Sequence, residues 1–234
     1  MRVSAIIAAA GDGLRFGGAE PKQFTLLGDR PILAWSLAAM SNSPIIDELV
    51  VVSHGNYGER VSEIASLYAG DKRVKIIPGG ATRQESIRAG LMAVDRGIRW
   101  VAVHDAARPF VTTALIEQAC LLAREVGAAI PVIPISDTVK EVSEERFVTR
   151  TVDRARLLLA QTPQVCKRDD LARAYEEADG VGFKATDEAS LLELAGISIG
   201  VVDGSPMNLK VTTQDDLSLA IALIKAWVRT SASE

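Results

Sequence analysis

A series of short apolar runs, separated by longer amphipathic segments, is the feature that most constrains the fold. Each run is continuously apolar rather than alternating, which is typical of strands buried on both faces of a mostly parallel sheet. Strands of this kind that alternate with helices favour the open α/β class. We therefore predict one open, mostly parallel, Rossmann-like sheet flanked by helices. The predicted strands are 3–9, 49–53, 74–78, 100–105, 128–134 and 197–202, and the predicted helices are 31–41, 57–69, 82–97, 112–127 and 169–178.

One segment departs from this alternation. Residues 136–154 are polar and partly alternating, with an acidic turn, "SEE", between "DTVKEV" and "RFVTRTV". This pattern predicts a protruding β-hairpin. A hairpin buries little by itself, so it is either a loose loop or an arm docked on another subunit. With no internal repeat or linker, we expect a single domain over residues 1–234 with a β-arm at about 136–155.

Charge and cysteine content exclude several classes of protein. The formal net charge of −4 argues against a protein whose main partner is a nucleic-acid backbone, because such proteins usually present a net basic face. Neither Cys120 nor Cys166 lies in a CxxC or CxH context, which makes a zinc site or a disulfide framework unexpected. Two idle thiols in a reducing cytoplasm is the interpretation we favour.

The first apolar run raises the question of a targeting segment. Arg2 followed by "VSAIIAAA" superficially resembles a short signal peptide. The run is at the bottom of the length range for a signal core, however, and far short of the ~20 residues that span a bilayer. A first buried strand explains it better, and we expect no membrane association and a cytoplasmic location.

The run leads into a glycine-rich segment, "AAAGDGLRFGGAEPKQF" (8–24). Glycine backbone N–H groups can approach and cradle phosphate oxygens. A dinucleotide fingerprint fits poorly, because Phe16 takes the third glycine position and the second strand ends in Ser53 instead of an acidic residue. A P-loop is excluded, since no Lys-Ser or Lys-Thr follows. Arg15 and Lys22 flank the loop, and phosphoryl transfer depends on such cations, although each could also be a solvated surface charge.

This segment resembles the signature of sugar-type nucleotidyltransferases, a small residue with Gly-x-Gly-x-Arg followed by Pro-Lys-Gln, and more closely that of cytidylyltransferases acting on polyol phosphates. Taken with seven further motifs in family order, the chain from about residue 3 to about residue 225 is similar to the 2-C-methyl-D-erythritol 4-phosphate cytidylyltransferase family. The seven motifs are "GGATRQES" (79–86), "VHDAARPF" (103–110), "DTVK" (137–140), "TVDR" (151–154), "QTPQ" (161–164), "TDEAS" (186–190) and "NLKVTT" (208–213).

The resemblance implies transfer of CMP from CTP to methylerythritol phosphate, with release of pyrophosphate. The catalytic residues that it implies are Arg15, Lys22, Arg154 and Lys210. The implied nucleotide-binding residues are Ala9, Ala10, Gly11, Asp12, Gly13, Gly80, Ala81, Ser86, Asp105 and Ala106. The implied acceptor-binding residues are Asp105, Arg108, Thr138, Arg154, Thr162 and Lys210.

Mg²⁺ or another divalent cation is expected, bound mainly through the CTP phosphates, because the chain has no dense carboxylate cluster that could form a metal cage. No general base is needed, since a phosphate monoester has a second pKa of about 6 and is already ionised near neutral pH. His104 is therefore not expected to act as a base. Since Thr138 and Arg154 lie on the arm, the resemblance implies that they reach into the site of a partner subunit in a homodimer.

Several alternatives stay open at this stage. Asp105 and Arg108 could form an ion pair that closes a turn, Thr82 could be a helix cap or a binding residue, and Arg83 is expected to be structural. For Ser86 a binding role is favoured. At the level of function, the rivals are a ribitol 5-phosphate cytidylyltransferase, a non-catalytic nucleotide-binding protein and an NAD(P)-dependent oxidoreductase.

Overall fold

The computed structural model describes residues 1–11, 16 and 20–231, with the backbone alone for 225–231. Within this part of the chain, eight strands form one sheet: β1 (Val3–Ala9), β4 (Ile46–Ser53), β5 (Arg73–Pro78), β6 (Trp100–Asp105), β7 (Ala128–Pro134), β10 (Leu158–Ala160), β11 (Gln164–Lys167) and β12 (Gly200–Asp203). Their order is β10-β7-β11-β6-β1-β4-β5, with β12 beside β7. Only β10 and β11 pair antiparallel with their neighbours in this sheet. The predicted mostly parallel open sheet is confirmed.

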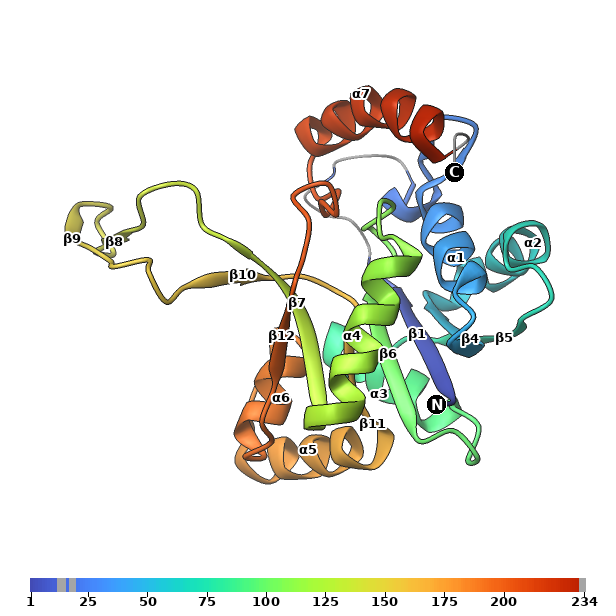
Figure 1. Ribbon diagram of the computed structural model, residues 1–234, viewed down its shortest axis with the longest axis horizontal. Helices are drawn as coiled ribbons and strands as arrows, with labels where there is room; N and C mark the ends of the chain where they lie inside the picture. The colour runs from blue at the N-terminus through green and yellow to red at the C-terminus, as the bar shows by residue number, and fades with distance from the viewer. Residues whose placement is uncertain (12–15, 17–19, 232–234) are drawn as a thin grey trace.

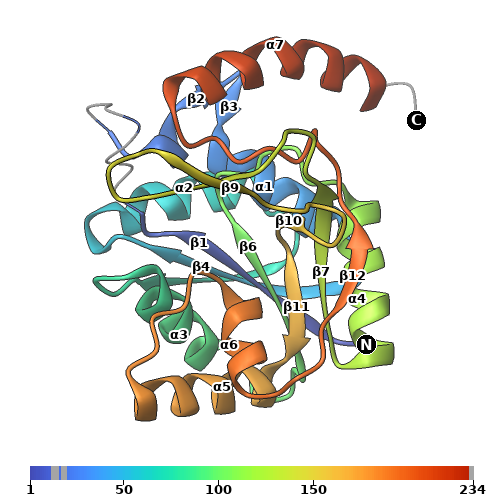
Figure 2. The same ribbon diagram turned by 90° about the vertical axis from the view of Figure 1, so that its left-hand side faces the viewer.

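Helices cover both faces of the sheet (Figures 1 and 2). Leu49 and Val51 pack with one set of helices, and Val50 and Val52 pack with the other set. All four side chains are fully buried, which explains why the strand is continuously apolar. The first set is α1 (Ile32–Asn42), α2 (Gly58–Tyr68) and α4 (Thr113–Val126), and the second is α3 (Arg83–Ala93), α5 (Arg168–Val181) and α6 (Glu188–Leu194).

The helix boundaries follow from local hydrogen bonds. Thr82 and Glu85 form the reciprocal capping box at the start of α3, with N–H to side-chain distances of 3.1 and 3.0 Å. Helix α3 ends at Ala93, so the predicted end at residue 97 is wrong: Val94 has a non-helical ψ of 137°, and Asp95 then accepts the N–H of Gly97 in a turn. Helix α4 ends at Val126, and Gly127, the predicted glycine stop, caps it with a φ of 106°.

Several elements lie outside the predicted set. Strand β11 has only two central apolar residues, Val165 and Cys166, and it is formed by pairing between β6 and β7. Helix α6 is seven residues long and is capped by Asp187, which accepts the N–H of Ser190 at 3.0 Å. Helix α7 (Gln214–Ser231) packs near the small hairpin of β2 (Leu26–Leu27) and β3 (Arg30–Pro31). In the described part of the chain, no helix is both long and apolar enough to cross a membrane.

The predicted β-hairpin is present and projects away from the body of the molecule (Figure 1). It consists of β8 (Lys140–Val142) paired antiparallel with β9 (Val148–Thr151). Phe147 and Val148 near its turn are 74% and 62% exposed. Apolar side chains so exposed suit a contact with another surface, but the role of the hairpin as a dimerisation arm stays a prediction.

Candidate active site

A cavity of about 350 Å³ opens at the carboxyl ends of β1 and β6, between two loops that follow β1 and β5. This edge of an open parallel sheet is where ligands bind in α/β proteins. Most of the predicted nucleotide-binding residues lie in this cavity. The residues that line it are Ala8, Ala9, Ala10, Gly11, Lys22, Gln23, His54, Gly80, Ala81, Thr82, Arg83, Ser86, Asp105, Ala106, Ala107 and Lys210.

The glycine-rich segment contributes both of its ends to the cavity. At one end Ala9 closes β1, and at the other the short 3-10 helix η2 (Lys22–Phe24) turns back toward it. The buried Gln23 amide donates to the Ala9 carbonyl at 2.7 Å, and Lys22 Nζ donates to the Val211 carbonyl at 2.8 Å. These bonds fix both ends of the loop. The predicted residues Asp12, Gly13 and Arg15 lie outside the described residues.

The second loop, residues 79–82, packs tightly against the first. A Cβ on Gly79 would lie 2.5 Å from the Ala10 Cβ and 2.8 Å from the Ser86 Oγ, so only glycine permits this close approach. Ser86 Oγ donates to the Thr82 carbonyl at 2.8 Å and accepts the Gly80 N–H at 3.1 Å. Gly80, Ala81 and Ser86 thus present one ordered surface to the cavity, and Thr82 is both the helix cap and a lining residue.

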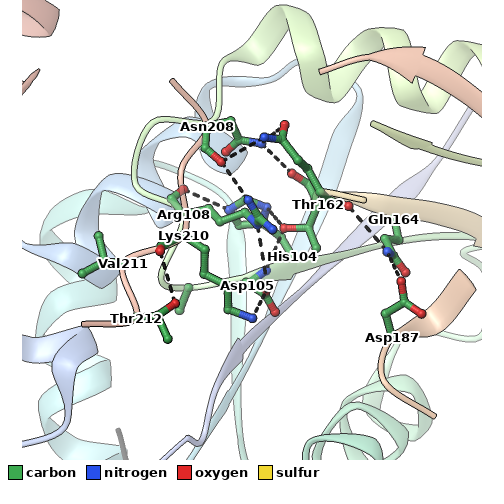
Figure 3. A network of polar contacts seen from close by, with 12 residues as sticks. His104, Asp105, Arg108, Thr162, Gln164, Asp187, Asn208, Lys210, Val211 and Thr212 are labelled. Carbon is green, nitrogen blue, oxygen red and sulfur yellow. Dashed lines mark hydrogen bonds and ion pairs between the residues drawn. The ribbon is translucent and has the colours of Figure 1, made fainter. Parts of the chain in front are cut away.

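Asp105 is the centre of charge in the site (Figure 3). Its Oδ2 lies 2.7 Å from Lys210 Nζ and 3.8 Å from Arg108 Nε, and its Oδ1 lies 3.4 Å from Arg83 Nε. Burial disfavours the charged carboxylate, but the three nearby cations outweigh burial and hold the pKa of Asp105 well below its usual range. Asp105 is therefore ionised at neutral pH. The anticipated Asp105–Arg108 pair is present, as one contact among three.

His104 lies behind Asp105 and is fully buried. Its Nδ1 is 3.0 Å from the Thr162 Oγ1, which also accepts the Asp105 N–H at 3.1 Å, and its Nε2 is 3.3 Å from the Arg108 carbonyl. Burial lowers the pKa of His104 to about 4, although Asp105 opposes that shift. His104 is enclosed and does not line the cavity, which supports the view that it is structural and is not a base.

The loop that carries Lys210 is anchored by Asn208, a residue that the sequence analysis did not single out. The fully buried side-chain amide of Asn208 donates to the Gln161 Oε1 at 3.2 Å and to the Thr162 carbonyl at 3.0 Å, while the backbone carbonyl of Asn208 accepts from Arg108 Nη1 at 2.8 Å (Figure 3). Gln23 and His54 were also missed. Gln23 stands within the "PKQ" motif, whereas nothing in the sequence marks His54.

The structure does not bring every predicted acceptor residue into the cavity. Arg108 and Thr162 contact Asp105 or its backbone without lining the cavity. Thr138 and Arg154 are exposed at the base of the arm, where Arg154 Nη1 donates to the carbonyls of Ile135 and Ser136. Within one chain these two residues lie apart from the cavity, so any role in the reaction requires another subunit or a movement of the arm.

The side chains around the cavity indicate how the expected Mg²⁺ could be bound. Among the described residues, no group of three or more His, Cys, Asp or Glu side chains could hold a metal ion. Asp105 lines the cavity, but its oxygens face Lys210 and Arg83. This arrangement fits a hydrated cation that is bound mainly through substrate phosphates better than it fits a cation enclosed by protein ligands.

Comparison with known proteins places the chain in one family. The family model for 2-C-methyl-D-erythritol 4-phosphate cytidylyltransferase matches residues 3–226. The protein of that name from Syntrophus aciditrophicus (strain SB) is 41% identical over 225 residues, covering 96% of each chain. The crystal structure of 4-diphosphocytidyl-2C-methyl-D-erythritol synthase from Anaerococcus prevotii DSM 20548 matches with a TM-score of 0.84 at 31% identity, covering 95% of this chain and 98% of that one.

The crystal structure of 2-C-methyl-D-erythritol 4-phosphate cytidylyltransferase from Thermus thermophilus gives a TM-score of 0.80 at 33% identity, covering 96% of this chain and all of the other. Sequence similarity and fold thus agree over nearly the whole chain. They also agree with a cavity that joins the glycine-rich segment and its Lys22 to Lys210 from a distant segment. The chain belongs to the 2-C-methyl-D-erythritol 4-phosphate cytidylyltransferase family and is a nucleotidyltransferase.

Proposed function

We propose that this enzyme transfers CMP from CTP to 2-C-methyl-D-erythritol 4-phosphate, giving 4-diphosphocytidyl-2-C-methyl-D-erythritol and pyrophosphate, a step in non-mevalonate isoprenoid precursor synthesis. The observation that carries the proposal is the cavity between two glycine-containing loops, which Lys22 lines together with the Lys210–Asp105 pair. Two lysines at the edge of a parallel sheet provide positive charge where a triphosphate and an acceptor phosphate would meet.

In this reaction an oxygen of the acceptor phosphate forms a bond to the α-phosphorus of CTP. The bond from that phosphorus to the bridging oxygen breaks, and pyrophosphate leaves with the electron pair. Catalysis of such a step rests on positioning and on stabilising negative charge. Lys22, together with Arg15, would stabilise the transition state and the departing pyrophosphate. The acceptor phosphate is already ionised near neutral pH, so no residue has to remove a proton from it.

The nucleotide would occupy the two loops. The backbone from Ala9 to Gly13 would surround the triphosphate, and Gly80, Ala81 and Ser86 would contact the cytosine and its sugar. Asp105 and Ala106 complete this side. The tight contact between the loops at Gly79 supports the assignment, because it fixes one binding surface relative to the other.

Mg²⁺ would be held mainly by the CTP phosphates, and when bound it would neutralise phosphate charge. The acceptor would lie near Lys210, with Arg108 and Thr162 holding Asp105 and its strand in place. We further propose that the acceptor site is completed by Thr138 and Arg154 from the arm of a second copy of this chain. Their position outside the cavity of their own chain supports this arrangement.

The test offers the purified protein CTP and Mg²⁺ with either methylerythritol phosphate or ribitol 5-phosphate and measures pyrophosphate. We expect turnover with methylerythritol phosphate. Turnover with ribitol 5-phosphate alone would identify the rival cytidylyltransferase. CTP binding without turnover of either acceptor would identify a binding protein, and thermal stabilisation by NAD(P)H but not by CTP would favour the oxidoreductase.

A further inference from the structure

A buried ion pair lies next to the active site and connects it to a helix that does not line the cavity. Glu188, the first residue of α6, is 1% exposed. Its two carboxylate oxygens accept from Arg83 Nη1 at 2.8 Å and from Arg83 Nη2 at 2.9 Å. Because this fork-to-fork pair orients both terminal nitrogens, it also fixes the direction of the remaining donor, Nε. Arg83 Nε lies 3.4 Å from Asp105 Oδ1.

The contacts form a continuous series of charges from α6 to the cavity. Glu188 holds Arg83, Arg83 contacts one oxygen of Asp105, and Lys210 contacts the other at 2.7 Å. Arg108 adds a third cation at 3.8 Å from Asp105. The described cluster thus contains three cations and two carboxylates. Removing the charge of Glu188 would leave Asp105 as the single anion among three cations, and Arg83 would then compete with Lys210 for it.

Stability alone is a weak reason for such a pair. Replacing a buried ion pair by well-packed apolar residues is often neutral or stabilising, because desolvation of both charges offsets their attraction. The helices that the pair connects already share an apolar cluster, to which α3 contributes Ile87 and Leu91 and α6 contributes Leu191 and Leu192. Apolar contacts therefore also hold α6 on this face, in addition to the pair that Glu188 forms.

We propose that Glu188 and Arg83 are positioning residues for the reaction: they hold the Asp105 carboxylate so that Oδ2 stays directed at Lys210. The expected effect on kcat rests on the proposed function, in which Lys210 contacts the acceptor phosphate. It gives the glutamate of "TDEAS" an indirect role, exerted through Arg83 and Asp105, because Glu188 itself does not line the cavity.

The main variant is Glu188→Gln, which keeps the shape and removes the charge. We expect kcat to fall about 10- to 100-fold, because a small misplacement of a positioned group has this effect on rate. The KM for CTP is expected to stay within about threefold of wild type, because the residues of the two nucleotide loops are unchanged. A purely structural residue would reduce the amount of folded enzyme and leave kcat per folded molecule unchanged.

A double variant, Arg83→Met with Glu188→Met, separates folding from positioning. It leaves no unpaired buried charge in the pair, so we expect a melting temperature close to that of the wild type with kcat still low. Arg88→Met is the matched control, because Arg88 is likewise an arginine of α3 that pairs with a carboxylate of another helix, Asp179 of α5, but it is not one of the cations that contact Asp105. We expect wild-type kcat in this control. Wild-type kcat in the double variant would overturn the proposal.

A second readout does not need turnover. In Glu188→Gln, Lys210 should be modified faster by an amine-reactive acetylating reagent, measured by peptide mass spectrometry, while Lys140 on the arm serves as the internal reference. An unchanged rate at Lys210 relative to Lys140 would overturn the inference. Failure of the proposed function would be seen differently, as absence of pyrophosphate release by the wild type, and the acetylation result would still decide the positioning role.

Discussion

Lys22 illustrates how a single side chain can be fixed by backbone from the other end of the chain. Its Nζ donates to the Val211 carbonyl, which belongs to the segment that also carries Lys210. A lysine held in this way has already lost its rotational freedom in the folded protein, so a phosphate can bind it without a further entropy cost. The sequence supplies the positive charge of Lys22, and the fold determines where that charge lies.

We expect Lys22→Ala to lower kcat by about 100- to 1,000-fold while CTP binds nearly as well as before, because a contact that strengthens in the transition state acts on rate. Turnover and calorimetric titration with CTP would measure the two effects. Lys72→Ala is the control: Lys72 also donates to a backbone carbonyl, that of Ile46 at 2.6 Å, but away from the cavity. Equal losses of kcat and CTP affinity in Lys22→Ala would contradict the catalytic role.

His104 provides a prediction on pH. Its pKa is about 4 in the folded protein and about 6.5 in an unfolded chain. Between these values the unfolded state binds more protons, so the free energy of unfolding rises with pH and falls as pH drops from 6.5 toward 4. His104 alone should lower the free energy of unfolding by about 2 kcal/mol between pH 7 and pH 5. Urea titrations at both pH values, compared with His104→Asn, would measure this; an equally steep dependence in the variant would contradict it.

At the scale of elements, the sequence predicted the parts of the fold that the hydrophobic effect specifies locally. Strands β1, β4, β6 and β7 come from apolar runs buried on both faces, and the edge strand β5 comes from a shorter run that is half-buried. Such runs are visible without any tertiary knowledge. Strand β11 could not be found in this way. Its residues Gln164–Lys167 are strand-like only because β6 and β7 pair with them on both sides.

The sequence predicted about as much of the site as it did of the fold. The glycine-rich segment was found from its own composition, and the second loop and Asp105 were found through the family motifs that contain them, because each of these features is a run of consecutive residues. The Arg83–Glu188 pair was not found, since it joins residues 105 positions apart and only the packing of α6 brings them together. The anchoring of the 208–211 segment by Asn208 was missed for the same reason.

The close contact of the two loops gives a prediction at this scale. We expect Gly79→Ala to weaken CTP binding by about tenfold, because the added methyl group must push the loop of Ala10 away from Ser86. Calorimetry with CTP would measure the affinity. Gly180→Ala in α5 is the control, since a Cβ there meets no atom within 4 Å and alanine favours helix. An unchanged affinity in Gly79→Ala would show that the loops can move apart freely.

For the whole molecule, the main question is whether two chains build one site. If Arg154 acts in the partner's cavity, a mixture of Arg154→Ala and Lys210→Ala chains, dissociated and reassembled together, should regain activity. Each mixed dimer would contain one site with both residues intact, so recovery to about a quarter of the wild-type rate is expected.

Pyrophosphate release before and after reassembly would measure this recovery. Each variant reassembled alone is the control and should stay inactive. No recovery in the mixture, with mixed dimers demonstrated by mass, would place Arg154 and Lys210 in the site of the same chain. A monomeric wild type with full activity would exclude any contribution from the arm of a second chain.

The bond between Lys22 and Val211 spans 189 positions of the chain and has a consequence for synthesis on the ribosome. The glycine-rich loop emerges well before the carbonyl that receives Lys22 and the ammonium of Lys210. Until then Asp105 lacks one of its cations and the loop lacks its tether. A nascent chain therefore carries an unfinished nucleotide site until the segment of Lys210 and Val211 has been made.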